Sequence, residues 1–347
     1  MTNNKMTYEQ VQEKVYKVLK DKCAYCTYLT LPKEITNDLV LATDFNMGSL
    51  DEVECIIDME KYFGITIEQT AAEKIKTVGD IVNYIYDSDV ATIHKTSPTN
   101  KIVKVKANLV KDLRDFVQSR KFSDVVFGLS GGMDSALVLA LAAEALGPQH
   151  VHTFMMATKN TSGLSIELAK QLSANIGNPH KFIDIQPRVD CALKTLPFTP
   201  KRKITTENIQ ARIRGDICMT YSNEYNWMVL SCGNKSEAAM GYCTLYGDTC
   251  GAVMPIGDLY KTEVYQMAEL YPQIPGAIIQ RAPTAELSPN QKDIDSLPEY
   301  SILDAYLQKI EAGEQDENEQ MADIRKKYNA MAFKRIQMAP AIKVRER

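Results

Sequence analysis

The sequence predicts two parts: a small all-α helical bundle, followed by an α/β unit whose parallel sheet carries helices on both faces. From residue 107 onward, short apolar runs alternate with amphipathic helical patterns, which is the order expected of a parallel sheet. The first 90 residues show helical periodicity and no strand pattern. Charge divides the chain at the same place, because residues 1–90 hold 16 of the 44 acidic side chains but only 9 of the 40 basic ones.

Three helices are expected in the acidic first part. Apolar residues recur at helical spacing over residues 7–22, 50–63 and 78–86, and Gly64 is placed to end the second helix. The periodicity is lost after residue 87, in a stretch that contains Ser97, Pro98 and Thr99 and is typical of a linker. We therefore expect a helical domain at residues 1–90, a linker at 91–104 and an α/β domain at 105–347.

The second part alternates helices and strands. The predicted elements are, in order, helix 107–119, strand 125–129, helix 136–146, strand 151–156, helix 164–176, strand 182–185, helix 207–221 and strand 227–231. Strands that alternate with helices in this way pair in parallel. In such sheets ligands bind beyond the carboxyl ends of the strands, so the loops that follow the strands are where a site is expected.

A glycine loop, Ser130-Gly-Gly-Met-Asp-Ser135, follows the first of these strands directly. Two adjacent glycines let the backbone approach an anion, and the next helix points its unpaired N–H groups at the same place. The loop therefore predicts a phosphate site. Asp134 is an unusual neighbour for a polyanion unless a divalent cation lies between them, so we assign it as a metal ligand. The alternative is an ordinary strand-to-helix turn in which Asp134 helps to cap the helix.

Composition excludes several classes of function. No basic stripe with interleaved aromatic residues indicates a nucleic-acid groove, and no apolar stretch is long enough to span a membrane. Eight cysteines are scattered without the spacing of a disulfide framework, which is typical of a reducing, cytoplasmic setting. Cys23 and Cys26 form a Cys-x-x-Cys pair, but the sequence offers no second pair to complete a zinc site.

Seven segments in this order resemble the motifs of NAD synthetases, and the likeness covers about residues 101–345. They are Ser130–Ser135, Glu207–Gly215, Gly233–Glu237, Gly241–Asp248, Lys261–Thr262, Ala282–Leu287 and Lys334–Arg335. The resemblance implies a Rossmann-like fold of the adenine nucleotide α-hydrolase type and the N-type ATP pyrophosphatase reaction. In that reaction the carboxylate of deamido-NAD attacks the α-phosphate of ATP, pyrophosphate leaves, and ammonia then displaces AMP to give NAD.

The resemblance also implies roles for individual residues. Asp134, Glu237 and Lys261 would be catalytic, the first two as Mg²⁺ ligands and the third as a neutraliser of phosphate charge. ATP would be bound by Gly128, Leu129, Ser130, Gly131, Gly132, Met133, Asp134, Ser135, Cys232, Lys261 and Thr284. Deamido-NAD would be bound by Asn208, Arg212, Glu237, Asp248 and Lys334. The alternative for most of the lysines and arginines is a solvated surface position.

Two departures from the family pattern bear on the chemistry. Cys232 stands where the family commonly has a threonine that contacts ATP, and Leu245 stands where ammonia-using members carry lysine. Only about 100 residues precede the synthetase-like part, fewer than a glutaminase domain needs, so we expect ammonia as the nitrogen donor, free or delivered by a separate glutaminase. The resemblance also implies a homodimer. The alternatives are another N-type ATP pyrophosphatase, or a non-catalytic carrier or scaffold.

The acidic first part resembles an acyl carrier protein over residues 7–86. The likeness rests on the segments Thr43–Glu54, Met59–Ile67 and Thr77–Ile81. It implies that Ser49 could carry a 4'-phosphopantetheine arm and that an enzyme of acyl chains could be a partner. Gly48 departs from the pattern, because an aspartate usually precedes the modified serine. Helix-end chemistry offers another explanation, since Ser49 and Glu52 have the spacing of a capping box.

Overall fold

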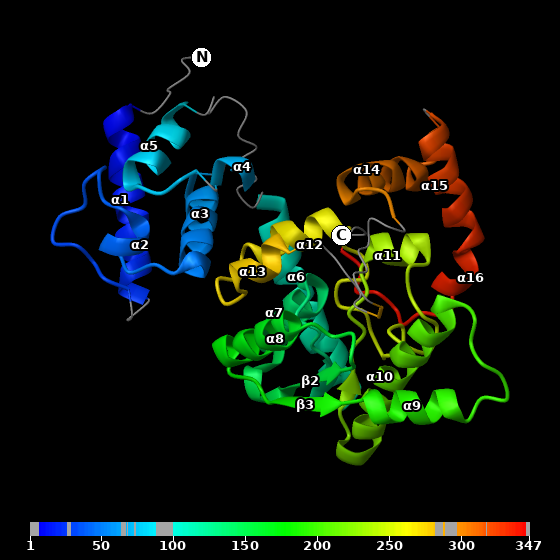
Figure 1. Ribbon diagram of the computed structural model, residues 1–347. Helices are drawn as coiled ribbons and strands as arrows, with labels where there is room; N and C mark the ends of the chain where they lie inside the picture. Colours follow the sequence, from blue (N-terminus) through cyan, green and yellow to red (C-terminus); the bar gives the residue numbers. More distant parts are fainter. Residues whose placement is uncertain are drawn as a thin grey trace. The chain divides into compact units, whose positions relative to one another are not determined.

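The computed structural model describes residues 7–25, 29–63, 67, 69–72, 74–87, 100–281, 287–288, 297–316 and 318–344. The chain forms two compact units, residues 1–97 and 98–347 (Figure 1). Each unit has its own apolar core. None of the described helices is both long enough and apolar enough to cross a membrane.

The first unit is helical throughout its described residues. Its helices are α1 (Tyr8–Tyr25), α2 (Leu41–Asp44), α3 (Ser49–Phe63), α4 (Gln69–Ala72) and α5 (Val78–Asp87). The three predicted helices correspond to α1, α3 and α5, and their apolar stripes form one core. Lys22, which is only 8% exposed, is held near this core by Glu54 and Asp58, each 3.2 Å from its ammonium nitrogen. Gly64, expected to end the second helix, lies outside the described residues.

The start of α3 differs from the capping box expected of Ser49 and Glu52. The carbonyl of Gly48 accepts the first helical hydrogen bond, from the N–H of Glu52, and the N–H of Gly48 donates to Asp51 Oδ2 at 2.9 Å. The cap is therefore Gly48, and its reciprocal carboxylate is Asp51. Glu52 contacts Lys76 instead, at 3.4 Å. The prediction was wrong by one residue, because Gly48 has no side chain to mark it as a cap.

A parallel sheet of four strands forms the centre of the second unit. Its strands are β1 (Val125–Gly128), β2 (Val151–Ala157), β3 (His180–Asp184) and β4 (Met228–Val229), in the order β3-β2-β1-β4. The predicted parallel pairing is confirmed. The last strand is shorter than predicted. Leu230 still donates its N–H to the carbonyl of Val126 on β1 at 3.0 Å, but the N–H of Ser231 donates to the carbonyl of Val253 instead.

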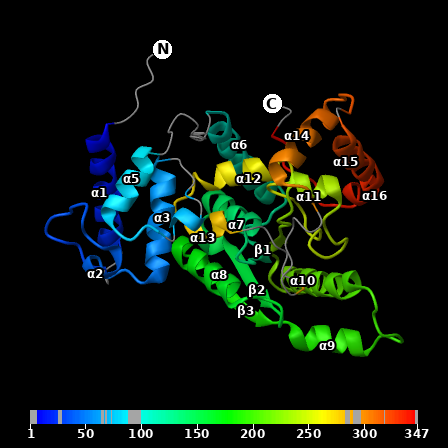
Figure 2. The same cartoon turned by 45° about the horizontal axis from the view of Figure 1, so that its top comes forward.

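Helices cover both faces of this sheet, as predicted (Figure 2). One face packs against α6 (Asn100–Ser119), α7 (Met133–Leu146), α8 (Gly163–Ile176), α12 (Lys261–Ala268) and α13 (Gly276–Gln280). The other packs against α9 (Gln186–Lys194) and α10 (Lys203–Tyr225), and a short 3-10 helix, η2 (Pro148–His150), precedes β2. Residues 100–104, expected in the linker, instead form the start of α6, whose buried Ile102 belongs to the same core.

A further helical cluster flanks the carboxyl end of β1 and β4. It contains α11 (Lys235–Met240), α14 (Tyr300–Glu311), α15 (Glu319–Ala330) and α16 (Ala332–Arg335). The first three share a small apolar core that includes Met240, Leu307 and Met321. The amino ends of α11 and α12 lie beside the glycine loop, since Asn234 and Lys261 at these ends contact Asp134.

Candidate active site

A cavity of about 470 Å³ lies at the carboxyl end of β1. Its wall brings together segments from the β1–α7 loop, α10, the loop after β4, α11 and α12. Most of the predicted site residues line it: Gly128, Leu129, Ser130, Gly132, Met133, Asp134, Ser135, Asn208, Cys232, Glu237, Asp248, Lys261 and Lys334. A cavity of this volume suits one nucleotide-sized ligand.

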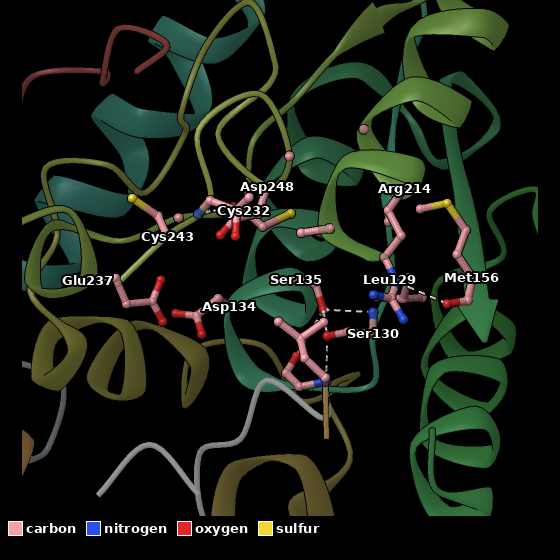
Figure 3. Close-up of a pocket in the computed structure, with 18 of the residues that line it drawn as sticks. Leu129, Ser130, Asp134, Ser135, Met156, Arg214, Cys232, Glu237, Cys243 and Asp248 are labelled. Carbon is pink, nitrogen blue, oxygen red and sulfur yellow. Dashed lines mark hydrogen bonds between the residues drawn. The ribbon is translucent and has the colours of Figure 1, made fainter. Parts of the chain in front are cut away.

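The glycine loop is built as the sequence predicts. Gly131 has a φ of 78°, and a Cβ at this position would lie 2.3 Å from the carbonyl oxygen of Ser165. The loop closes on itself, because the N–H of Ser130 donates to the hydroxyl oxygen of Ser135 at 3.2 Å (Figure 3). Helix α7 starts at Met133, earlier than predicted, so its amino end faces the cavity.

Asp134 lies in the first turn of α7 but makes no capping hydrogen bond there. The cap residue is Gly132, and it has no side-chain cap. The Asp134 carboxylate turns instead toward that of Glu237 (Figure 3) and pairs with the ammonium group of Lys261. The same ammonium nitrogen lies 3.7 Å from Glu237 Oε1. Two acidic groups and one cation thus converge beside the glycine loop.

Lys261 is almost completely buried, with 2% of its surface exposed. Burial alone would lower the pKa of its ammonium group, but the charges of Asp134 and Glu237 outweigh this effect and raise the pKa. The side chain is therefore a permanent cation. Asp134 and Glu237 remain about one-fifth exposed, toward the cavity.

The donor set at this place fits Mg²⁺. Magnesium is commonly held by one or two carboxylates together with substrate phosphates, and Asp134 and Glu237 supply two carboxylates next to a phosphate loop. Among the described residues, no group of three or more acidic, histidine or cysteine side chains could hold a metal without such help. Further ligands of a Mg²⁺ ion held by these two carboxylates would come from a bound phosphate group or from water.

The amino ends of α11 and α12 are fixed by a buried carboxylate. Asp304, on α14, is 1% exposed and accepts hydrogen bonds from the hydroxyl of Ser236 and from the N–H of Thr262. The Ser236 hydroxyl oxygen in turn accepts the N–H of Lys261 at 2.9 Å. Helices α11 and α12 carry Glu237 and Lys261, so Asp304 holds these two side chains in a fixed relation.

A second group of predicted residues meets at the loop that follows α11. Thr244, which is buried, donates its hydroxyl to Asn208 Oδ1 at 2.7 Å and its N–H to Asp248 Oδ1 at 2.6 Å. The ammonium group of Lys334 donates to the carbonyls of Gly241 and Cys243, at 2.8 and 2.7 Å. Asn208, Asp248 and Lys334 therefore face one end of the cavity.

Desolvation by the surrounding protein raises the pKa of the Asp248 carboxyl to about 6, and the hydrogen bond from the N–H of Thr244 only partly opposes this. At neutral pH the group is still predominantly ionised. It places a negative charge at the end of the cavity that Lys334 also lines.

Two predicted residues of the described part of the chain, Arg212 and Gly131, do not line the cavity. Arg212 is exposed on α10, outside the cavity wall, and its Nε donates to the carbonyl of Leu245 at 3.3 Å. Its part in binding deamido-NAD stays a prediction. Thr284 lies outside the described residues. Gly131 does not line the cavity either, but it shapes the loop that does.

Two arginines line the cavity without having been predicted. Arg214, on α10, donates through Nε to the carbonyl of Met156 at 3.1 Å (Figure 3), and Arg281 contacts the hydroxyl of Ser165. Arg214 had a sequence signal. Glu207, Ala211, Arg214 and Cys218 all line the cavity at the spacing of one helical face. No such spacing over several turns marks Arg281, because it directly follows the short helix α13.

Four cavity-lining thiols are held in their neutral form. Burial raises the pKa of Cys218 and Cys243 to about 12 and that of Cys250 to about 11, and it raises the pKa of Cys232 well above its usual range. A neutral thiol is a poor nucleophile. Cys232 therefore contributes apolar wall at the place where the family commonly offers a hydroxyl.

Comparison with known proteins gives a consistent result. The model of the NAD synthase family matches residues 105–340. A glutamine-dependent NAD(+) synthetase of Acinetobacter baylyi is 46% identical over 215 residues, which cover 59% of this chain and 40% of that protein. The chain thus spans about two-fifths of the length of the first curated relatives that it matches.

Two solved structures match over almost their whole length. The NMN synthetase of Francisella tularensis has a TM-score of 0.62 and 29% identity, and the match covers 67% of this chain and 95% of that one. The NH3-dependent NAD synthetase of Campylobacter jejuni has a TM-score of 0.57 with the same identity and coverage. Since the family model spans well over half of the residues, including the whole glycine loop with Asp134, Glu237 and Lys261, the chain belongs to the NAD synthase family.

Proposed function

We propose that the second unit catalyses the ATP-dependent amidation of deamido-NAD to NAD, with release of AMP and pyrophosphate. The observation that carries this proposal is the convergence of the glycine loop, the two carboxylates and Lys261 on one cavity wall. Such a set neutralises and orients a triphosphate. The four described cavity thiols are neutral, and we propose that the chemistry occurs directly between the bound substrates.

The reaction then has two steps. A carboxylate oxygen of deamido-NAD attacks the α-phosphorus of ATP, and the bond from that phosphorus to pyrophosphate breaks. Ammonia attacks the acyl carbon of the adenylate, AMP leaves with the bonding electron pair, and the nitrogen loses a proton to give the carboxamide. The loop N–H groups and Lys261 stabilise the charge on the phosphates in the first step. When bound, Mg²⁺ held by Asp134 and Glu237 would supply further neutralisation of phosphate charge.

Deamido-NAD would occupy the end of the cavity near Asn208, Asp248 and Lys334. We propose that part of the dinucleotide extends beyond the cavity wall, toward exposed Arg212 on the same helix as Asn208. The homodimer that the family resemblance implies stays a prediction.

We propose ammonia as the nitrogen donor of this unit, free or delivered by a separate glutaminase. Support comes from the match to the NH3-dependent NAD synthetase of Campylobacter jejuni, which is 29% identical and is covered over 95% of its chain. The glutamine-dependent synthetase of Acinetobacter baylyi is 46% identical over the matched residues, so the donor must be tested directly. The purified chain is expected to form NAD from deamido-NAD, ATP and Mg²⁺ with ammonium, and at a rate at least about tenfold lower with glutamine. Steady-state rates with the two donors provide the measurement, and equal rates would contradict the proposal.

A second candidate product is NMN, because an NMN synthetase is among the solved structures that match over 95% of their length. The same assay separates the two. Initial rates with deamido-NAD and with nicotinate mononucleotide, each with ammonium, give the ratio of kcat/KM values. A ratio that favours the mononucleotide would move the proposal to NMN formation and would leave the assignment of ATP-binding residues unchanged.

For the first unit, we propose that Ser49 accepts 4'-phosphopantetheine, as its resemblance to acyl carrier proteins implies. Helix α3 starts at Ser49, and three acidic residues on its first turns, Asp51, Glu52 and Glu54, would suit a basic partner enzyme. Coexpression with a phosphopantetheinyl transferase should raise the intact mass by one arm, and Ser49→Ala should abolish the increase. An unchanged mass for the unaltered chain would remove the carrier role.

A further inference from the structure

We propose that Asn234 is a positioning residue that holds both metal-binding carboxylates, Asp134 and Glu237, in the arrangement that Mg²⁺ requires. This inference deepens the proposed function and rests on it. The two carboxylates are 103 positions apart in the chain and belong to different helices, α7 and α11. Asn234 lies between them and is completely buried, with 0% of its surface exposed.

Asn234 contacts both carboxylate residues through three hydrogen bonds. Its side-chain amide nitrogen donates to Asp134 Oδ1 at 2.8 Å. Its side-chain oxygen accepts the N–H of Glu237 at 3.0 Å, and its own backbone N–H donates to Glu237 Oε2 at 3.4 Å. The last two bonds form a capping box at the start of α11. The first bond extends that box to a carboxylate on another helix.

Capping alone does not explain an asparagine here. Serine, threonine and aspartate serve about equally well as helix caps, because only a side-chain oxygen is needed. The additional NH₂ group is what reaches Asp134. With Asn234 on Oδ1 and Lys261 on Oδ2, each oxygen of Asp134 has a separate partner. The amide is neutral, so it can orient the carboxylate without competing with a metal ion for its charge.

The test uses the full chain and compares Asn234→Ser with Asn318→Ser. Serine retains a capping oxygen at residue 234 but lacks the group that reaches Asp134. Asn318 is the matched control, because it caps α15 by accepting the N–H of Met321 at 2.9 Å and does not line the cavity. Mn²⁺ is the metal probe, and its binding is measured by electron paramagnetic resonance in the presence of a non-hydrolysable ATP analogue.

We expect Asn234→Ser to weaken Mn²⁺ binding by about 10–100-fold, the usual cost of losing a partner of a metal ligand. The Mg²⁺ concentration for half-maximal NAD formation should rise by a similar factor, while KM for deamido-NAD stays within about twofold. Asn318→Ser should leave all three quantities unchanged. Asn234→Asp, which also keeps the cap but places a negative charge against Asp134, should lose at least as much Mn²⁺ affinity.

Three results would overturn the proposal. The first is Mn²⁺ affinity within twofold of the parent in folded Asn234→Ser. The second is an equal loss of affinity in the Asn318→Ser control. The third is unfolding of both Asn234 variants, judged by circular dichroism, which would assign the residue to the fold alone. Failure of the proposed function is distinguishable, because the parent chain would then bind Mn²⁺ with the ATP analogue but would form no NAD.

Discussion

Replacing Lys261 with methionine is expected to lower the rate of NAD formation by at least about 100-fold. The ammonium group is the cation placed between the phosphate loop and the two carboxylates, and removing one such electrostatic group typically costs about 10²–10³ in rate. Without it, Asp134 and Glu237 repel each other and the incoming triphosphate. The change should appear mainly in kcat and in KM for ATP, measured by pyrophosphate release.

Loss of stability must be separated from loss of activity in this variant. Lys235→Met is a suitable control, because the side chain of Lys235 is only 16% exposed and is also paired, with Asp258 and Glu311, but does not line the cavity. The double variant Lys261→Met/Asp134→Asn removes one charge of each sign. It should regain part of the lost thermal stability and remain inactive. Parent-like turnover in folded Lys261→Met would contradict the role of this residue.

Gly131→Ala is expected to disable the phosphate loop and to destabilise the second unit. An alanine at a φ of 78° costs about 1–2 kcal/mol from backbone conformation alone. The added Cβ would also lie 2.3 Å from the carbonyl oxygen of Ser165, so either the loop or the start of α8 must move. We expect a loss of ATP affinity of more than about tenfold, measured by calorimetry, and a lower unfolding midpoint.

Gly177→Ala provides the control for this prediction. Gly177 ends α8 with a φ of 82°, but a Cβ there would meet nothing within 4 Å. Its alanine variant carries the same backbone strain without the collision. ATP affinity should therefore be unchanged in Gly177→Ala. Equal effects of the two substitutions on ATP binding would show that close packing against Ser165 is not what shapes the loop.

Much of the fold follows from local patterns in the sequence. Alternating apolar strands and amphipathic helices were enough to predict the parallel sheet and its two covered faces. The spacing of apolar residues and the length of each apolar run indicate which residues are buried. The ends of elements were less predictable. The last strand ends early because the N–H of Ser231 donates to the carbonyl of Val253 and not to β1. This contact joins separate segments, so the local sequence does not predict it. The cap at Gly48 was missed for a similar reason, since it depends on backbone geometry.

The candidate site was predictable where motifs mark it and hidden where partners come from distant segments. Asp134, Glu237 and Lys261 each stand in a motif, and the structure brings them together. Asn234 and Asp304 act through hydrogen bonds to residues on other helices, so their neighbours in the sequence give no hint of what they hold. Arg212 lies in a motif that implies deamido-NAD binding, but its exposed side chain is outside the cavity wall, so this role stays a prediction.

The hydrogen bonds that Asp304 accepts from Ser236 and Thr262 have a consequence for folding during translation. During synthesis the ribosome releases the sheet and the glycine loop well before α14, which carries Asp304. A nascent chain that ends at α13 therefore has its phosphate loop but lacks Asp304, whose hydrogen bonds align α11 with α12. The relation between Glu237 and Lys261 is thus fixed late in translation, when about the last fifth of the second unit, from residue 300 onward, has emerged.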